Sequence, residues 1–283
     1  MRDWKGCNVS LATLVYPVID PVAFRLGPLA IRWYGLAYVA GFVAAALILR
    51  KLNRSWKIGI TDDQQVDIVL AAIIGVIVGG RLGYVLFYGG SEYLREPLKV
   101  FATWDGGMSF HGGLAGILIA GWFISKRIGV SFLQLADLGA VGAPIGFLLG
   151  RITNFVNGEL WGRVTDAPWG MVFPTGGPLP RHPSQLYEAF LEGLVLLCVL
   201  LWLSRRKRPE GVIFGVLLSG YAISRILVEF VREPDLQLGF IAGPFTMGQL
   251  LSLPMLAVGV WVVWRALKAG KASAASTEGE SDA

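Results

Sequence analysis

Long hydrophobic runs separated by short polar segments dominate the pattern of this chain. The runs are residues 29–49, 66–87, 108–125, 133–155, 184–203, 211–231 and 245–264, the third being marginal at its ends. Each is close to the roughly 20 residues that a helix needs to cross a bilayer. The pattern therefore predicts an all-α fold, a polytopic membrane protein built as a bundle of seven transmembrane helices.

Composition supports a membrane location. Mean hydropathy is +0.58, and only 16% of the residues are charged, against roughly 25% in an average soluble domain. Residues 1–27 carry several charges and lack the pattern of a cleavable signal peptide. We expect one integral-membrane domain over residues 1–270, and a disordered tail over 271–283 because this end is rich in Ala, Ser, Glu and Gly.

The distribution of Lys and Arg predicts the orientation. With the N-terminus outside, thirteen of them fall in inner segments and eight in the longer outer segments. Short cytoplasmic loops carry such an excess, so the N-terminus is predicted to be periplasmic and the C-terminus cytoplasmic. The net charge of +5 then reflects topology, and we expect no nucleic-acid partner.

The two cysteines add little. Cys7 and Cys198 are far apart, and neither has a Cys or His nearby at metal-ligand spacing. The sequence therefore predicts no disulfide and no metal site.

Costly polar residues gather at one depth of the predicted bundle. Arginine in hydrocarbon costs at least ~2.5–3.5 kcal/mol on insertion scales, so such residues indicate a functional site. Asp137 is an exception toward the inner half. Two helix faces carry related groups, Tyr221 with Arg225 and Glu229 on one, and Arg151 with Asn154 on another. The residues predicted in or near the outer half are Tyr34, Arg81, His111, Arg151, Asn154, Glu188, Tyr221, Arg225 and Glu229.

Each of these residues also has a structural explanation. Charge counting does not decide, since Glu159, Glu188, Glu192 and Glu229 together can balance three arginines. A purely structural network therefore stays open, although polar groups gathered at one depth are expected to face a cavity. The structural alternatives are an intrahelical ion pair for Arg225 and Glu229, snorkelling for Arg81, an interfacial aromatic belt for Tyr34, a helix cap for His111, and an interhelical hydrogen bond for Asp137.

A phospholipid head group of the outer leaflet is the nearest anion at this depth. Arginine offers a planar fork of donors that binds phosphate oxygens in pairs. Gly112 and Gly113 would let a head group approach the backbone. Such a site can hold a lipid for structure, transport it or cut it. A flippase, channel or small-molecule transporter is the competing class, but a transport path needs polar groups through the whole bilayer.

Residues 150–162, GRITNFVNGELWG, resemble the signature of the prolipoprotein diacylglyceryl transferase family without a gap. The resemblance extends over nearly the whole chain. Supporting matches are residues 32–35, 79–84, 104–113, 181–188 and 221–225.

The resemblance implies transfer of the sn-1,2-diacylglyceryl group from phosphatidylglycerol to the lipobox cysteine thiol of a bacterial prolipoprotein. A thioether forms and glycerol phosphate leaves, at the outer face of the inner membrane, with no metal or organic cofactor. An enzyme with the same lipid and another acceptor stays an alternative, because the chain displays no peptide-binding motif. The positions that the family treats as important align with Tyr34, His111, Arg151, Asn154, Glu159, Gly162, Tyr221, Arg225 and Glu229.

The chemistry suggests a role for these residue types. A free cysteine, with a pKa near ~8.5, is mostly protonated at neutral pH, and negative charge grows on the departing phosphate. We expect Arg151 and Arg225 to hold the phosphate, Asn154 and Tyr34 to orient the head group, and Glu229 to fix Arg225. His111 is the candidate general base, unless the arginines lower the thiol pKa enough by themselves. Phosphatidylglycerol is also expected to be bound by Tyr221, Glu159, Gly162 and Arg81.

Overall fold

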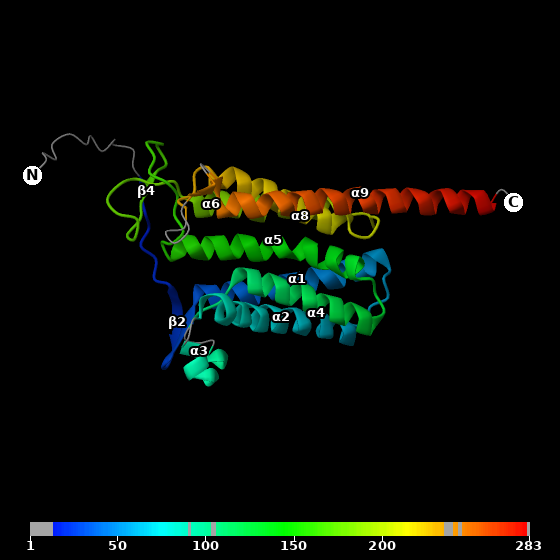
Figure 1. Cartoon of the computed structure of the whole chain (residues 1–283), viewed down its shortest axis with the longest axis horizontal. Helices are drawn as coiled ribbons and strands as arrows, with labels where there is room; N and C mark the ends of the chain where they lie inside the picture. Colours follow the sequence, from blue (N-terminus) through cyan, green and yellow to red (C-terminus); the bar gives the residue numbers. More distant parts are fainter. Residues whose placement is uncertain (1–13, 90–91, 103–105, 235–239, 243–244, 282–283) are drawn as a thin grey trace, which may run out of the picture. The chain divides into compact units, whose positions relative to one another are not determined.

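The computed structural model describes residues 14–89, 92–102, 106–234, 240–242 and 245–281 (Figure 1). It is mostly helical, as the sequence predicts. The helices are α1 (Trp33–Trp56), α2 (Asp62–Tyr88), α3 (Glu92–Arg95), the 3-10 helix η1 (Pro97–Phe101), α4 (Phe110–Ile128), α5 (Phe132–Val156), α6 (Ser184–Glu188), the π-helix η3 (Ala189–Val195), α7 (Leu196–Leu203), α8 (Val212–Glu229) and α9 (Met247–Ser281).

Three short strand pairs accompany the helices, so the fold is not purely α. Strand β1 (Leu14–Val15) runs parallel to β4 (Met171–Val172). The other two pairs are antiparallel: β2 (Val22–Leu26) with β3 (Leu29–Arg32), and β5 (Phe240–Ala242) with β6 (Phe245–Thr246).

Six of the described helical segments are long and apolar enough to cross a membrane, which confirms a polytopic membrane protein. They are Trp33–Trp56, Asp62–Tyr88, Phe132–Val156, Ser184–Leu203, Val212–Glu229 and Met247–Lys271. Helix α4 is not among the six. It has 19 residues, with Lys126 and Arg127 in its last turn, and it corresponds to the marginal third run of the sequence.

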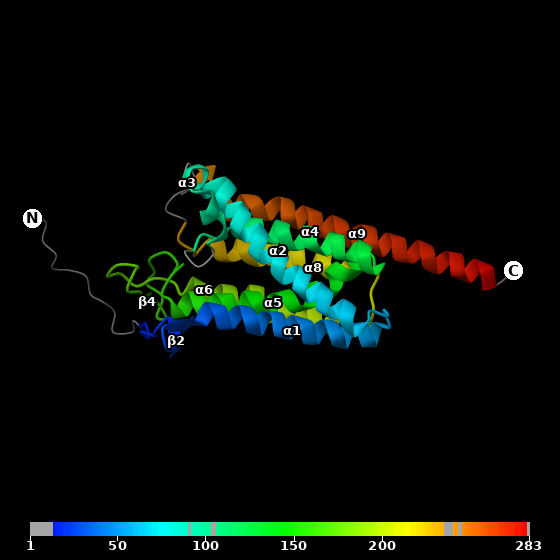
Figure 2. The same cartoon turned by 90° about the horizontal axis from the view of Figure 1, so that it is seen from below.

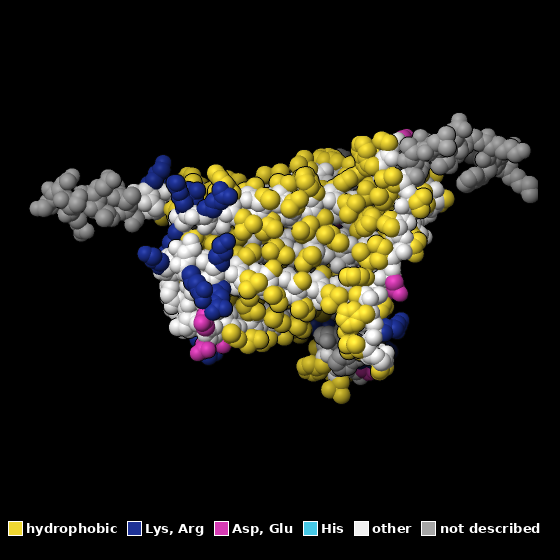
Figure 3. All heavy atoms as spheres, turned by 180° about the vertical axis from the view of Figure 1, so that it is seen from behind, with side chains coloured by type: hydrophobic (Ala, Val, Ile, Leu, Met, Phe, Trp, Pro, Cys, Tyr) yellow, Lys and Arg dark blue, Asp and Glu magenta, His cyan; other side chains and the backbone are white. Residues whose placement is uncertain are grey.

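Large hydrophobic side chains are exposed along these helices, as expected for surfaces that face lipid. Leu47 is 64% exposed, Trp202 60% and Val260 55%. Figure 3 shows hydrophobic side chains spread widely over one face of the molecule.

The chain divides into two compact units, one of Met1–Val43 with Ala140–Ala283 and the other of Ala44–Gly139. One membrane domain over residues 1–270 stays a prediction. Helix α9 is described as far as Ser281, and disorder of the tail from residue 271 also stays a prediction.

The second unit is organised by glycines where α2 meets α4. A Cβ on Gly75 would lie 2.7 Å from the carbonyl oxygen of Gly116, so only glycine allows this approach. The glycines at this contact therefore serve helix packing. Ser109 caps α4 by accepting a hydrogen bond from the Gly112 N–H, which is the role that the sequence left open for His111.

In the first unit, α8 and α9 lie side by side (Figures 1 and 2). A Cβ on Gly215 would lie 2.8 Å from the carbonyl oxygen of Gly259. Tyr16 lies beyond the end of α5, where its hydroxyl donates to the carbonyl oxygens of Phe155 at 2.6 Å and Val156 at 2.9 Å. These are carbonyls that a helix end leaves unsatisfied. Burial raises the pKa of Tyr16.

Candidate functional site

A polar triad joins the start of α1 to the end of α5 within the first unit. It consists of Tyr34, Asn154 and Glu159. The Tyr34 hydroxyl donates to Glu159 Oε1 at 2.7 Å. Asn154 Nδ2 donates to the same carboxylate oxygen at 3.0 Å and to the Tyr34 hydroxyl. The sequence placed Tyr34 and Asn154 at one depth, and Glu159 entered only by charge counting and by the resemblance. The hydrogen bonds of Tyr34 exceed what an interfacial aromatic belt requires.

A second group of side chains, the charge cluster, gathers three arginines and three glutamates from α5, α6, η3, α8 and the segment after α8. Glu188 and Glu192 are fully buried, and Glu229 is 3% exposed. The two signs balance. The ion pairs are Arg151 Nε with Glu188 Oε2 at 3.2 Å, Arg151 Nη2 with Glu192 Oε2 at 3.3 Å, Arg225 Nη1 with Glu188 Oε1 at 2.6 Å, Arg225 Nη2 with Glu229 Oε2 at 3.0 Å, and Arg232 Nη1 with Glu188 Oε1 at 3.0 Å.

Glu188 is the centre of the charge cluster because it contacts all three arginines. The intrahelical pair of Arg225 and Glu229 does form, but it is one edge of a larger network. From the sequence, Glu188 was placed near the outer half of the bilayer but was given no function. Glu192 entered only the charge count, and Arg232 was counted among the basic residues of the outer segments. The four-residue spacing of Glu188 and Glu192 in an apolar run was the signal available.

A π-helix lies where the two glutamates contact Arg151. Glu188 lies just before η3, and Glu192 lies within it. The wider turn of a π-helix re-aims side chains, and such segments are frequent at functional sites. Gly193 allows the close approach to α5, since a Cβ there would lie 2.7 Å from the Leu148 Cβ. Leu148 is one turn before Arg151, so this contact sets the position of the guanidinium.

Several carboxylate oxygens of the charge cluster have spare capacity. Glu188 Oε2, Glu192 Oε1 and Glu229 Oε2 are buried without a hydrogen-bond partner among the described residues. Glu188 Oε2 and Glu229 Oε2 are near an arginine, but no N–H is directed at them. Within the same described residues, Glu192 Oε1 has no ion-pair partner either, and leaving such a buried acceptor unsatisfied costs about 1–3 kcal/mol or more, so this oxygen can accept a hydrogen bond from a donor such as a hydroxyl group of a bound head group.

Gly162 sets the backbone that carries Arg232. Its N–H donates to the His182 carbonyl oxygen at 2.8 Å, and it forms a β-bridge with Arg232. A Cβ on Gly162 would lie 2.7 Å from the His182 Cβ, so no larger residue fits. Arg163 Nε donates to the Arg232 carbonyl oxygen at 3.0 Å. Burial lowers the pKa of His182.

Two residues next to α9 complete the surroundings of Glu229. The Thr246 hydroxyl donates to Glu229 Oε1 at 2.8 Å, and a Cβ on Gly248 would lie 2.8 Å from the Glu229 Cδ. Sequence reasoning missed both. Tyr221, one turn before Arg225, packs against Phe147 with the two rings tilted at 52° and their centroids 5.1 Å apart.

Arg81 and His111 belong to the second unit. Arg81 is 5% exposed, and its nitrogens donate to the carbonyl oxygens of Val100 at 2.9 Å, Gly106 at 2.5 Å and Lys99 at 2.5 Å. This geometry favours a role in holding the segment after α2, while lipid binding by Arg81 stays a prediction. His111 lies exposed in the first turn of α4, and its role as base stays a prediction.

Among the described residues, no group of three or more His, Cys, Asp or Glu is placed to hold a metal ion. Asp137 is buried in α5, at 3% exposure. Cys198 is an exposed thiol. Cys7 lies outside the described residues, as do Trp104 and Asp105 of the 104–113 motif.

Comparison with known proteins gives one answer. The family model of prolipoprotein diacylglyceryl transferase matches residues 21–265. A phosphatidylglycerol–prolipoprotein diacylglyceryl transferase of Geobacter sulfurreducens is 56% identical over 245 residues, covering 87% of this chain and 94% of the relative. Proteins of the same name from Brucella anthropi and Brucella canis are 49% identical, covering 90% and 93% of this chain and 94% and 97% of the relatives.

Proposed function

Because the chain belongs to the prolipoprotein diacylglyceryl transferase family, as the resemblance of its signature indicated, we propose that it carries out the first step of bacterial lipoprotein maturation. Its substrates are phosphatidylglycerol and a prolipoprotein, the two molecules that the names of its relatives contain. The diacylglyceryl group passes to the sulfur of the lipobox cysteine. The products are a thioether and glycerol phosphate.

The charge cluster is the observation that supports this chemistry best. Arg151 and Arg225 approach a common carboxylate, Glu188, which fixes the separation of the two guanidinium groups. Each arginine has five N–H donors, more than its carboxylate contacts use. The spare donors of both side chains bind the phosphate diester of phosphatidylglycerol.

Displacement at carbon explains why these arginines matter. The sulfur attacks the glyceryl carbon that is bonded to the phosphate oxygen, the carbon–oxygen bond breaks, and its electron pair stays on the phosphate. Arg151 and Arg225 stabilise this growing charge in a site that excludes water. The thiol proton passes to His111 acting as general base, or leaves without a dedicated base if the arginines lower the thiol pKa enough.

The polar triad and Gly162 position the groups of the site that lie near the C-terminal end of α5 and in the segment after it. Asn154 and Tyr34, fixed by Glu159, orient the head group beside Arg151, one turn earlier on the same helix. Gly162 keeps Arg232 against Glu188, and Glu229 holds Arg225. Tyr221 forms part of the wall one turn before Arg225.

We place the reaction at the periplasmic side of the bacterial inner membrane. The excess of Lys and Arg in the segments after α1, α4, α7 and α9 supports an outer N-terminus and an inner C-terminus. This topology requires α4 to cross as a seventh span. The ends of α5 and α8, which carry Arg151 and Arg225, then lie toward the periplasm.

A direct assay tests the function. The purified protein is incubated with phosphatidylglycerol and a lipobox peptide, and the peptide is followed by mass. We expect one diacylglyceryl increment, absent when serine replaces the peptide cysteine. An unmodified cysteine peptide would refute the proposal. Modification of the serine peptide would point to another acceptor chemistry, and lipid movement without modification would point to a transporter.

A further inference from the structure

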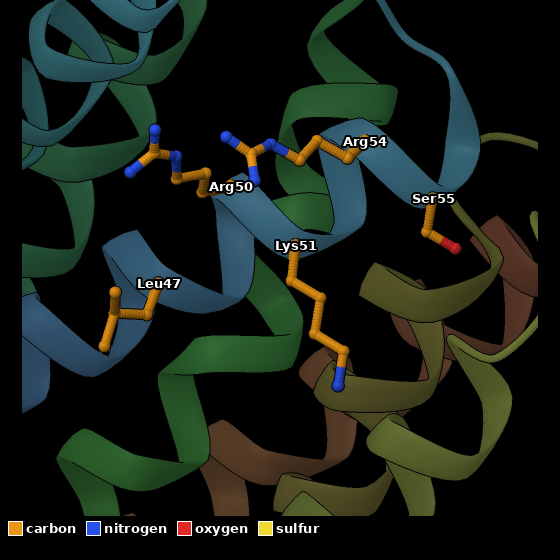
Figure 4. A pocket seen from close by; sticks show the side chains of 5 residues that line it. All are labelled: Leu47, Arg50, Lys51, Arg54 and Ser55. Carbon is orange, nitrogen blue, oxygen red and sulfur yellow. The ribbon is translucent and has the colours of Figure 1, made fainter.

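A shallow hollow of about 500 Å³, wide open to the surroundings, lies along the end of α1 that is opposite to the polar triad. It is lined by Leu47, Arg50, Lys51, Arg54 and Ser55 (Figure 4). Their spacing of three and four residues places all five on one face of the helix. Figure 4 shows the side chains of Arg50 and Arg54 extending to one side and that of Lys51 to the other. Cationic groups therefore flank the hollow.

These cations are only partly balanced. Arg50 Nη2 is 3.7 Å from Asp62 Oδ2, and both side chains are more than half exposed, so this pair is weak. Within the part of the chain that the structure describes, no carboxylate pairs with Lys51 or Arg54. The hollow therefore keeps a positive charge that an anion can neutralise.

The order of side chains along α1 matches the order of groups along a phospholipid. Leu47, which is 64% exposed, lies about one turn deeper in the span than Arg50 and Lys51 and about two turns deeper than Arg54. Basic residues at the cytoplasmic end of a span attract anionic lipids, and the arginine fork fits phosphate oxygens. An acyl chain would follow Leu47 while its phosphate meets Arg54 and Lys51.

We propose that this face of α1 binds the head group of an anionic phospholipid of the inner leaflet, at a second lipid site. Lys51 lies 17 residues after Tyr34 on the same helix, about 26 Å along its axis. The second site is therefore too far from the polar triad to serve the same lipid head group. It holds a lipid that anchors the turn between α1 and α2, and it uses no residue proposed for transfer.

Lipid titration of the purified full chain tests the second site. The double variant Lys51→Gln/Arg54→Gln is compared with the control Lys126→Gln/Arg127→Gln, which removes the same charge from the last turn of α4. Phosphatidic acid and phosphatidylcholine are titrated in neutral detergent, with retained lipid followed by native mass spectrometry. We expect the double variant to bind phosphatidic acid on the order of tenfold more weakly, the control to bind like wild type, and phosphatidylcholine to show no difference.

A third variant should change lipid affinity in the opposite direction. Asp62→Asn releases Arg50 from its ion pair and should strengthen binding of phosphatidic acid. Equal weakening in the double variant and its control would overturn the site, because net charge alone would then explain the effect, and unchanged binding in the double variant would overturn it too. Transfer to a lipobox peptide is measured in parallel at saturating phosphatidylglycerol and should stay normal, so the outcome does not depend on the proposed function.

Discussion

At the scale of single residues, the charge cluster shows how the energetic cost of placing arginines in or near the membrane is offset. Three arginines in membrane-spanning segments or at their edges are costly alone, but Glu188, Glu192 and Glu229 neutralise them in place. Removing one partner of a buried pair leaves an uncompensated charge and typically costs about 3–5 kcal/mol. None of these six residues can therefore be replaced without leaving a buried charge unbalanced, and the effects of substituting them should be strongly coupled.

Glu188 offers the sharpest test of this coupling. Glu188→Gln keeps the size of the side chain but removes the charge shared by three arginines, and we expect transfer to fall by roughly 100-fold or more because both phosphate-binding groups move. The value of kcat should fall more than KM rises. The control is Glu233→Gln, which loses a pair with Arg181 at 3.0 Å outside the cluster. Equal effects of the two variants would contradict a central role for Glu188.

The two phosphate-binding arginines should not tolerate lysine. Arg151→Lys and Arg225→Lys keep the positive charge, but they lose the planar fork that holds two oxygens at once. We expect at least a ~100-fold loss of kcat/KM, in the range seen when one transition-state donor is removed. Membrane insertion and extraction should stay normal. Near-normal turnover in either variant would remove that arginine from the reaction.

The role of His111 is decided by pH dependence. A general base must be unprotonated, so the rate should fall toward acid pH, where the base takes up a proton. His111→Gln should lower the rate at neutral and alkaline pH and abolish this acidic limb, so that the two proteins have similar rates at acid pH. If the limb persists in the variant, His111 is a positioning donor and the thiol needs no dedicated base.

Most residues of the polar triad and the charge cluster could be predicted from the sequence. Spacing alone placed Tyr221, Arg225 and Glu229 on one helix face and Arg151 with Asn154 on another, and the resemblance added Glu159. The sequence could not supply Arg232 or Thr246, because both lie in connecting segments whose path is set by tertiary contacts. The sequence predicted Glu188 to be a polar residue near the outer half of the bilayer. It could not predict that three arginines contact this one carboxylate, because that contact depends on how the helices pack.

At the scale of elements, η3 is the part that periodicity could not predict. The fifth hydrophobic run is right in extent, yet a π-helix changes which face each residue occupies. Glu188 and Glu192, four residues apart, lie on one side of either kind of helix, but the residues that follow η3 are rotated relative to an unbroken α-helix. The strand pairs were missed because the strands are two to five residues long, at or below the short end of the windows in which alternation is recognised.

Gly193 tests whether the packing of η3 on α5 positions Arg151. Gly193→Ala adds a methyl group 2.7 Å from the Leu148 Cβ, and overpacking of this kind costs about 1–3 kcal/mol. We expect a lower unfolding temperature and reduced transfer. The control is Gly146→Ala in α5, where a Cβ meets no atom within 4 Å, and it should leave both measurements unchanged. Full activity in Gly193→Ala would show that η3 can shift against α5 without displacing Arg151.

At the scale of the whole molecule, topology depends on α4. The six clear spans alone would leave both termini on the same side of the membrane, whereas a seventh span separates them. The glycines that bring α2 against α4 favour a helix that stays in the bilayer with its neighbour. The Lys and Arg of its last turn favour a cytoplasmic end.

Thiol labelling distinguishes the two topologies. In a background with Cys7→Ser and Cys198→Ser, single cysteines replace Asp63 at the start of α2, Leu98 in η1 and Val130 after α4, and intact spheroplasts are treated with a membrane-impermeant reagent. If α4 crosses, Val130→Cys is protected like Asp63→Cys while Leu98→Cys is labelled. If α4 does not cross, Val130→Cys is labelled like Leu98→Cys. Lysed cells provide the control for reactivity, because all three cysteines should label once the membrane is broken. Protection at residue 130 would fix α4 as a span, and with it the outer position of the helix ends that carry Arg151 and Arg225.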